Sequence, residues 1–146
     1  LRHLAGAAAR PVTTPHDILG AVQAIHDAPP RLVYVFAGAG SLALHWLHSV
    51  AGSSRTVLEA RDCYAPRSLG EIVQGVPRQA ASPGVAHAMA RWAVERAARL
   101  AEGDWPLLGV ACTAAIATDR ERRGADRACV AVSDGRTAHG FTMTMA

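Results

Sequence analysis

The stretch Leu32-Val33-Tyr34-Val35-Phe36, followed by Ala37-Gly38-Ala39-Gly40-Ser41, decides the fold. Its first half is an apolar run of β-favouring residues without alternation, which predicts a strand covered on both faces. Its second half consists of small residues, which predicts a tight turn into the next element. A buried strand that leads through such a turn into a helix is typical of α/β proteins.

The segments on either side alternate between helical and strand patterns. Pro29 and Pro30 end a helix that precedes the strand, Ser82 is placed to cap the longest helix, and Asp134-Gly135 is a strong hairpin signal. We therefore predict a three-layer α/β/α sandwich with a mixed central sheet and an antiparallel edge. The expected elements are helices at 15–28, 42–52, 66–74 and 83–103, and strands at 32–36, 56–64, 107–113, 129–133 and 137–145.

Length and composition bound the architecture. A chain of 146 residues is the size of one domain, so we expect a single domain over 1–146, with 1–12 as a poorly ordered or docked lead. Half of the residues are hydrophobic, which excludes a disordered chain. Neither a run long enough to span a membrane nor a signal-peptide pattern is present, so we expect a cytoplasmic protein that does not engage a membrane.

Charge and cysteine usage exclude other classes. All 15 basic residues are arginine, the chain has no lysine, and the arginines are interleaved with 12 acidic residues at a net charge of +3. This distribution predicts a solvated mixed surface and no nucleic-acid partner. Cys63, Cys112 and Cys129 are odd in number and far apart, so we predict core thiols without a disulfide framework or a zinc ribbon.

Two small-residue turns are the best candidates for a ligand site. Gly38-Ala39-Gly40-Ser41 stands at a strand-to-helix junction, where backbone N–H groups and the helix dipole favour an anion. The turn satisfies neither the dinucleotide nor the P-loop pattern, and it is equally compatible with a plain turn. Thr113 ends a later strand, so its hydroxyl is expected at the same sheet edge, unless it merely closes that strand.

Two further clusters are weaker candidates. Ser53, Ser54 and Arg55 could bind phosphate, or they could cap a helix and lead into a strand. His45 and His48 lie one helical turn apart, but no acidic residue or third histidine is adjacent in sequence. We therefore expect no metal site.

The order of segments resembles the C-terminal domain of CinA, the pyridine-nucleotide amidase family. The similarity covers residues 30–145 and rests on the turn after the first strand, Val50-Ala51-Gly52-Ser53-Ser54, Tyr64, Ser82-Pro83 and Gly109-Val110-Ala111-Cys112-Thr113. The resemblance implies a compact α/β/α fold that commonly oligomerises and hydrolyses nicotinamide mononucleotide to nicotinate mononucleotide and ammonia without an organic cofactor. Residues 111–120 look closest to the CinA-like domain that precedes a nucleotidylyltransferase-type domain in longer proteins.

The sequence departs from the family at the residues that handle protons. The family's Glu-Ser-Cys-Thr-Gly-Gly turn places its presumed nucleophilic serine on Ala37 and the preceding acid on Phe36. The family's lysine falls on Leu69, and a chain without lysine cannot restore it. Arginine cannot replace that base because its pKa stays above about 12.

These observations predict a divergent CinA-like domain that binds a phosphate-bearing small molecule, such as a pyridine nucleotide, between the Gly38 and Thr113 turns. In this hypothesis the turn holds the phosphate, Tyr64 borders the ring and arginines close over the anion. The expected ligand-binding residues are Gly38, Ala39, Gly40, Ser41, Ser53, Ser54, Arg55, Tyr64, Thr113, Arg120 and Arg122.

Two alternatives remain open at this stage. The first is an active amidohydrolase in which Ser41 or Thr113 serves as a relocated nucleophile, helped by Tyr64 or a histidine. The second is a structural module that oligomerises within a longer polypeptide. A homo-oligomer is expected in either case from the resemblance.

Overall fold

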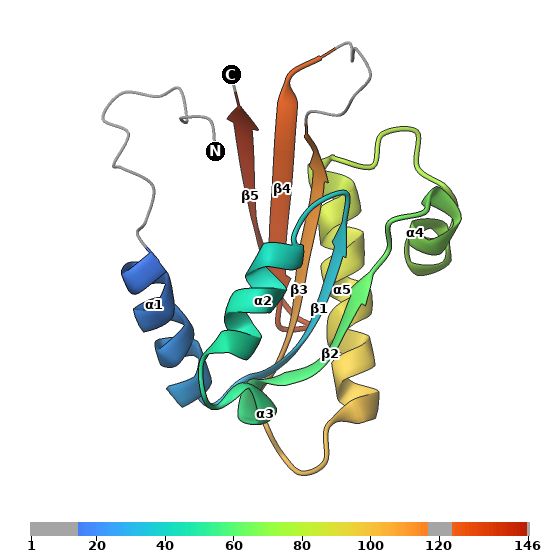
Figure 1. Ribbon diagram of the computed structural model, residues 1–146. Coiled ribbons are helices and arrows are strands. Elements are labelled where there is room, and N and C mark those ends of the chain that lie inside the picture. The colour runs from blue at the N-terminus through green and yellow to red at the C-terminus, as the bar shows by residue number, and fades with distance from the viewer. Residues whose placement is uncertain (1–14, 117–123, 146) are drawn as a thin grey trace.

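A mixed five-stranded sheet forms the centre of the computed structural model, which describes residues 15–116 and 124–145 (Figure 1). The strand order is β2-β1-β3-β4-β5. In chain order the elements are α1 (Pro15–Asp27), β1 (Arg31–Ala37), α2 (Ser41–Ser49), α3 (Ser53–Thr56), β2 (Val57–Asp62), α4 (Pro66–Val73), α5 (Pro83–Leu100), β3 (Leu107–Ala115), β4 (Asp126–Ser133) and β5 (Ala138–Met145).

Strand direction divides the sheet into two parts. β1 pairs in parallel with both β2 and β3, whereas β3, β4 and β5 pair in an antiparallel manner. Ala37 at the end of β1 lies opposite Thr113 near the end of β3, so both strands finish at the same sheet edge. The predicted mixed sheet with an antiparallel edge is therefore confirmed.

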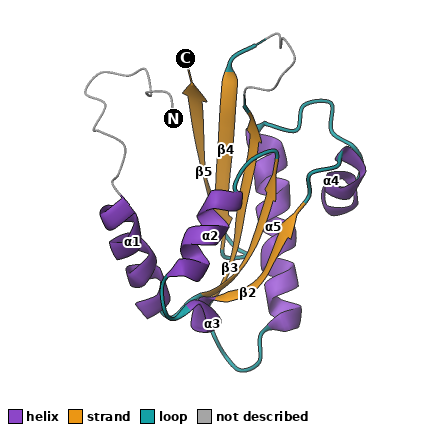
Figure 2. Cartoon of the chain, viewed as in Figure 1, coloured by secondary structure: helices purple, strands orange, loops and turns teal. Residues whose placement is uncertain are grey.

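Helix α5 covers one face of the sheet and packs on it at very short range (Figure 2). A Cβ atom placed on Gly109 of β3 would lie 2.0 Å from the carbonyl oxygen of Ala90 in α5. Glycine at this position therefore lets the backbones of helix and strand approach. The fully buried side chains along this contact are mostly small, and they include Ala86, Ala90, Ala93 and Ala97 of α5 and Ala111 of β3.

Helix α2 covers only part of the other face. Leu32, Tyr34 and Phe36 of β1 are buried there beneath Ala43 and Leu44 of α2. Partly buried residues of β2 and β3 complete this smaller core. Helix α1 packs against α2 and α3. Helices therefore lie on both sides of the sheet, as predicted, but the second side is covered less completely.

Local signals in the sequence mark several boundaries correctly. The Ser82 hydroxyl accepts a hydrogen bond from the backbone N–H of Val85 at 3.3 Å, as expected of a helix cap. The Asp134-Gly135 hairpin is also confirmed, because Asp134 Oδ1 accepts hydrogen bonds from the N–H groups of Arg136 and Thr137, both at 2.8 Å. These contacts lower the pKa of Asp134. Cys63, Cys112 and Cys129 are free thiols, as expected.

The strand predicted at 56–64 begins one residue late, because a short helix was missed. Gly52 has φ = 111°, a conformation that glycine adopts easily, and it lets the chain enter α3. Thr56 then ends α3, and its hydroxyl hydrogen-bonds to Nδ1 of the buried His26 at 2.8 Å.

Within the described residues, no helix combines the length and the apolar character that a membrane span requires.

Candidate functional site

The site is built where β1 and β3 end side by side. Gly38 follows β1 with φ = 81°, and a Cβ there would lie 2.1 Å from the carbonyl oxygen of Ala114. Gly40 has φ = 130° and begins α2 as its N-cap, while its carbonyl accepts a hydrogen bond from the Tyr34 hydroxyl at 3.0 Å. Both glycines are therefore required by the backbone path of this turn.

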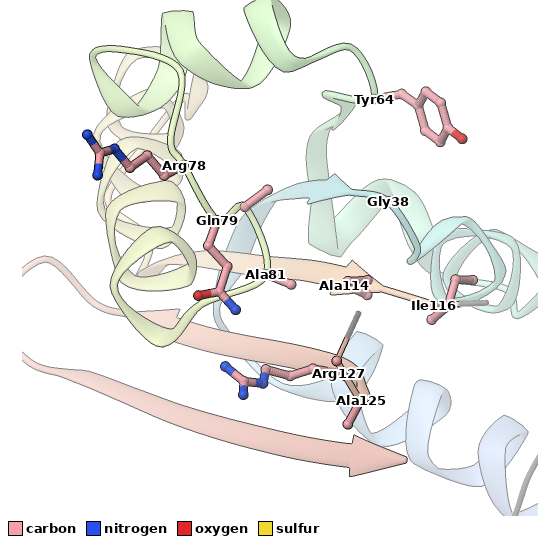
Figure 3. Close-up of a pocket in the computed structure, with 12 residues that line it drawn as sticks. Gly38, Tyr64, Arg78, Gln79, Ala81, Ala114, Ile116, Ala125 and Arg127 are labelled. Atoms are coloured by element: carbon pink, nitrogen blue, oxygen red, sulfur yellow. The ribbon is translucent and has the colours of Figure 1, made fainter. Parts of the chain in front are cut away.

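A cavity of about 480 Å³ opens beside the Gly38 turn (Figure 3). It lies between the ends of β1 and β3, the start of β4 and the loop that joins α4 to α5. This is the carboxyl edge of the parallel strands, where α/β proteins commonly bind ligands. Its lining residues are Gly38, Tyr64, Arg78, Gln79, Ala80, Ala81, Ala114, Ala115, Ile116, Gly124, Ala125 and Arg127.

Two arginines are among the residues that line this cavity, and Figure 3 shows the guanidinium of Arg78 extending away from Gly38, Ala114 and Arg127. Arg78 comes from the α4–α5 loop and Arg127 from β4, where it lies opposite Ala115. Neither guanidinium forms an ion pair with any residue that the structure describes, and no acidic residue is among the described lining residues. Figure 3 shows the side chains of Gln79 and Arg127 extending toward each other, from the loop and from the strand. The cavity therefore offers positive charge and amide hydrogen bonding to an anion.

Thr113 does not present its hydroxyl to this cavity. The residue is fully buried on the α5 side of β3, and its Oγ1 donates a hydrogen bond to the carbonyl of Ala80 at 2.8 Å. The predicted convergence of the two strand ends is therefore correct, but Thr113 is not among the lining residues. Its hydrogen bond instead fixes the loop that forms one wall of the cavity.

Only one of the four predicted residues of the Gly38 turn lines the cavity. Gly38 lines the cavity, whereas Ala39, Gly40 and Ser41 do not. Ser41 is the exposed first residue of α2. Tyr64 does line the cavity, and its side chain is largely exposed, with a relative accessibility of 75%. Arg120 and Arg122 lie outside the described residues.

Ser53, Ser54 and Arg55 belong to α3, which lies at the opposite end of the sheet from this cavity (Figure 1). The Ser53 hydroxyl hydrogen-bonds to Nδ1 of His48 at 2.6 Å. Arg55 pairs with Asp27 of α1 at 3.5 Å. The structure therefore separates these three residues from the cavity and gives two of them partners within the protein.

Cys63 and Cys112 are poor nucleophiles. Cys63 is buried and Cys112 is half-buried, and this burial raises the pKa of both thiols. Burial also raises the pKa of the Tyr34 phenol well above its ordinary value. Since the thiolate is the reactive form of cysteine, neither thiol is activated. Among the described residues, no group of three or more histidine, cysteine, aspartate or glutamate side chains is arranged to hold a metal.

Sequence reasoning missed Arg78, Gln79 and Arg127, which carry the polar character of the cavity. Arg78 and Gln79 follow Pro77 in a loop without an identifiable motif. Arg127 is the second residue of β4, a strand that was predicted to start only at Cys129. If the start of β4 had been paired with Ala115 at the end of β3, Arg127 would have been identified as a residue beside the cavity.

Comparisons with known proteins give the fold a name. No protein-family model and no curated protein match this sequence. Among solved structures, a CinA-superfamily protein from Escherichia coli has a TM-score of 0.70 at 19% identity, over 91% of this chain and 78% of that one. A CinA-superfamily protein from Enterobacter cloacae has a TM-score of 0.72 at 12% identity, over 98% and 85%. The competence/damage-inducible protein CihA from Agrobacterium tumefaciens has 0.64 at 19%, over 89% and 82%.

The chain is therefore an α/β protein with a cavity at the carboxyl ends of its parallel strands. More specifically, it has the CinA-like fold that the sequence predicted. At these identities the similarity defines the fold, and the chemistry must be argued from the residues of this chain.

Proposed function

We propose that this CinA-like domain binds a phosphate-bearing small molecule, of which a pyridine nucleotide is the leading candidate, in the cavity beside Gly38. Arg127 carries the proposal, because its guanidinium extends toward Gln79 and forms no ion pair with a described residue, in a cavity without described acidic residues. Arginine donates paired, charge-assisted hydrogen bonds to phosphate, and a bound anion would compensate the charge of this guanidinium.

The size and lining of the cavity support a ligand larger than inorganic phosphate. Its volume of about 480 Å³ lies within the range of small-molecule sites. Tyr64 offers an exposed aromatic ring on which a planar heterocycle can stack. Gln79 adds amide donors and acceptors for a ribose or a carboxamide. A nucleotide would use all three kinds of contact.

Binding without hydrolysis is the second half of the proposal. In the resemblance described above, the family's presumed serine falls on Ala37 and its lysine on Leu69, which is buried. Apart from the phenol of Tyr64, the described lining residues offer no side chain that commonly acts as a nucleophile or general base. Neither proposed replacement supports catalysis, because the Thr113 hydroxyl is bonded to Ala80 in the interior and Ser41 lies outside the lining.

Titration calorimetry with nicotinamide mononucleotide, nicotinate mononucleotide and inorganic phosphate tests the binding. We expect heat with at least one nucleotide, and Arg127→Ala should weaken its binding about tenfold or more. Arg99→Ala is the matched control, because it removes an exposed arginine from the far end of α5. No heat and no rise in melting temperature with either nucleotide would refute the proposal.

An ammonia assay on nicotinamide mononucleotide tests the absence of catalysis separately. We expect no ammonia above the uncatalysed rate. Release that is lost in Ser41→Ala would instead establish the amidohydrolase alternative, with the nucleophile on α2. Binding and hydrolysis are measured independently, so one half of the proposal can fail without the other.

A further inference from the structure

The edge strand β5 lacks the protection that such strands usually have. It is the last strand of the sheet, and none of the described residues pairs with its outer edge. Its eight residues pair in continuous register with β4, without a bulge. The strand contains no proline and no aspartate, glutamate, lysine or arginine. Charges, prolines and bulges are the common devices that prevent an exposed edge from pairing with another strand.

Large apolar side chains stand on one face of β5. Gly140 faces α5, because a Cβ there would lie 2.7 Å from Nε2 of His87. Side chains alternate along a strand, so Phe141 and Met143 lie on the opposite face. The core under α2 includes residues of β1, β2 and β3 only, and it leaves Phe141 64% and Met143 43% exposed.

We propose that β5 pairs in an antiparallel manner with β5 of a second copy of this chain and joins the two sheets into one. A strand edge is complementary to itself about a two-fold axis, which makes a second copy the simplest occupant. Charge repulsion does not oppose this choice, because the strand contains no aspartate, glutamate, lysine or arginine that self-pairing would place opposite its own copy. This interface is independent of the proposed ligand, since the described lining of the cavity contains no residue of β5.

The alternation of side chains limits the register. Directly opposite residues must share a face, so the two-fold axis passes through a residue position, and we place it at Phe141 or Thr142 in the middle of the strand. In the first register Phe141 lies opposite Phe141 of the second copy, and in the second it lies opposite Met143. Either arrangement brings the exposed apolar side chains together across the axis.

The available area predicts a reversible dimer. The exposed parts of Phe141 and Met143 in two copies amount to on the order of 400 Å². Specific interfaces bury about 1,200–2,000 Å² in total, so the strand backbones and neighbouring surface must add the remainder. We therefore expect the proportion of dimer to rise with protein concentration.

Analytical ultracentrifugation of the full chain tests the proposal. We expect a concentration-dependent dimer in the wild type and a monomer in Phe141→Lys/Met143→Lys, because lysines placed about the axis repel one another. Leu42→Lys is the matched control, since Leu42 is an exposed apolar residue on α2 and should leave the dimer intact. A monomeric wild type, a dimer that survives the double substitution, or a dimer equally lost in the control would each overturn the proposal.

Disulfide trapping provides a test that does not depend on the folding of the double variant. Residues opposite one another about the axis have Cα atoms about 4.5–5.5 Å apart, within the range of a disulfide. On oxidation, either Phe141→Cys or Thr142→Cys should form a covalent dimer, whereas Ala138→Cys and the wild type should not. If neither variant forms one, or if all form it equally, β5 does not pair in this way.

Discussion

Polar side chains at one end of the sheet are bonded to other groups of the protein, whereas those at the other end border a cavity. Where β1 begins, His26 bonds to Thr56 and to the carbonyl of Leu47 at 2.8 Å each, and Arg55 pairs with Asp27. Where β1 and β3 finish, Arg78 and Arg127 border a cavity and form no ion pair with a described residue.

The difference helps to distinguish structural polar groups from those available to a ligand. Partners from within the protein fix a side chain and use its hydrogen-bonding capacity, whereas guanidiniums without protein partners can bind a ligand. Substitutions at the first end should therefore change the free energy of unfolding. Substitutions of the arginines at the second end should change ligand affinity.

The largest effect is expected from His26→Ala. His26 is 2% exposed, and its loss leaves the Thr56 hydroxyl and the Leu47 carbonyl without their partner beside a new cavity. We expect a loss of about 2–4 kcal/mol in the free energy of unfolding, measured by chemical denaturation. His45→Ala, at an exposed position, should stay within about 0.5 kcal/mol of the wild type. Equal effects of the two substitutions would contradict a structural role for His26.

Gly38→Ala should affect both stability and binding. A methyl group there would meet the Ala114 carbonyl while the backbone holds φ = 81°, so we expect a loss of about 1–3 kcal/mol. Nucleotide binding should also weaken, because this turn forms part of the cavity wall. Gly75→Ala is a useful comparison, since Gly75 also has positive φ but its added methyl would meet nothing within 4 Å. A smaller loss at Gly38 than at Gly75 would refute the steric argument.

Arg127→Lys should separate charge from geometry at the cavity. Lysine keeps the positive charge but cannot donate the paired hydrogen bonds of a guanidinium. We expect nucleotide affinity between those of the wild type and Arg127→Ala, with the free energy of unfolding unchanged within about 0.5 kcal/mol. Calorimetry and chemical denaturation on the same samples provide both values. Affinity as low as that of the alanine variant would mean that charge alone contributes little.

The smallest effect is expected from Arg55→Ala. The side chains of Arg55 and Asp27 are 58% and 63% exposed, so solvent screens their ion pair. We expect a loss below about 1 kcal/mol, which decreases further in high salt, and no change in nucleotide affinity. Weaker binding in this variant would show that the two ends of the sheet are not separate in function.

Much of the fold could be predicted because its signals are local. The apolar run before Gly38 identified β1, and Ser82 and Asp134-Gly135 marked a helix start and a hairpin. The meeting of the Gly38 and Thr113 strand ends followed from parallel pairing. The strand end alone does not indicate to which face of the sheet the Thr113 hydroxyl points. That face depends on the register of β3 and on the packing of α5 against it.

The residues that line the cavity were harder to predict, because they depend on the direction of α2 and on the pairing of the strands. Helix α2 runs back along the sheet, so Ser53, Ser54 and Arg55 arrive at the opposite end although they follow the Gly38 turn closely in sequence. Arg127 enters the site only through the pairing of β4 with β3. Arg78 enters through a loop that Thr113 holds in place.

The close approach of α5 to Gly109 also limits which residues of such a domain can change during evolution. Where helix and strand nearly touch, only hydrogen atoms and methyl groups fit between them, so sequence change there is confined to the smallest residues or needs compensating pairs. Apart from Gly38, the exposed lining residues of the cavity, such as Tyr64 and Gln79, have no such restriction. New ligand preferences can therefore evolve at the rim while the interior stays the same.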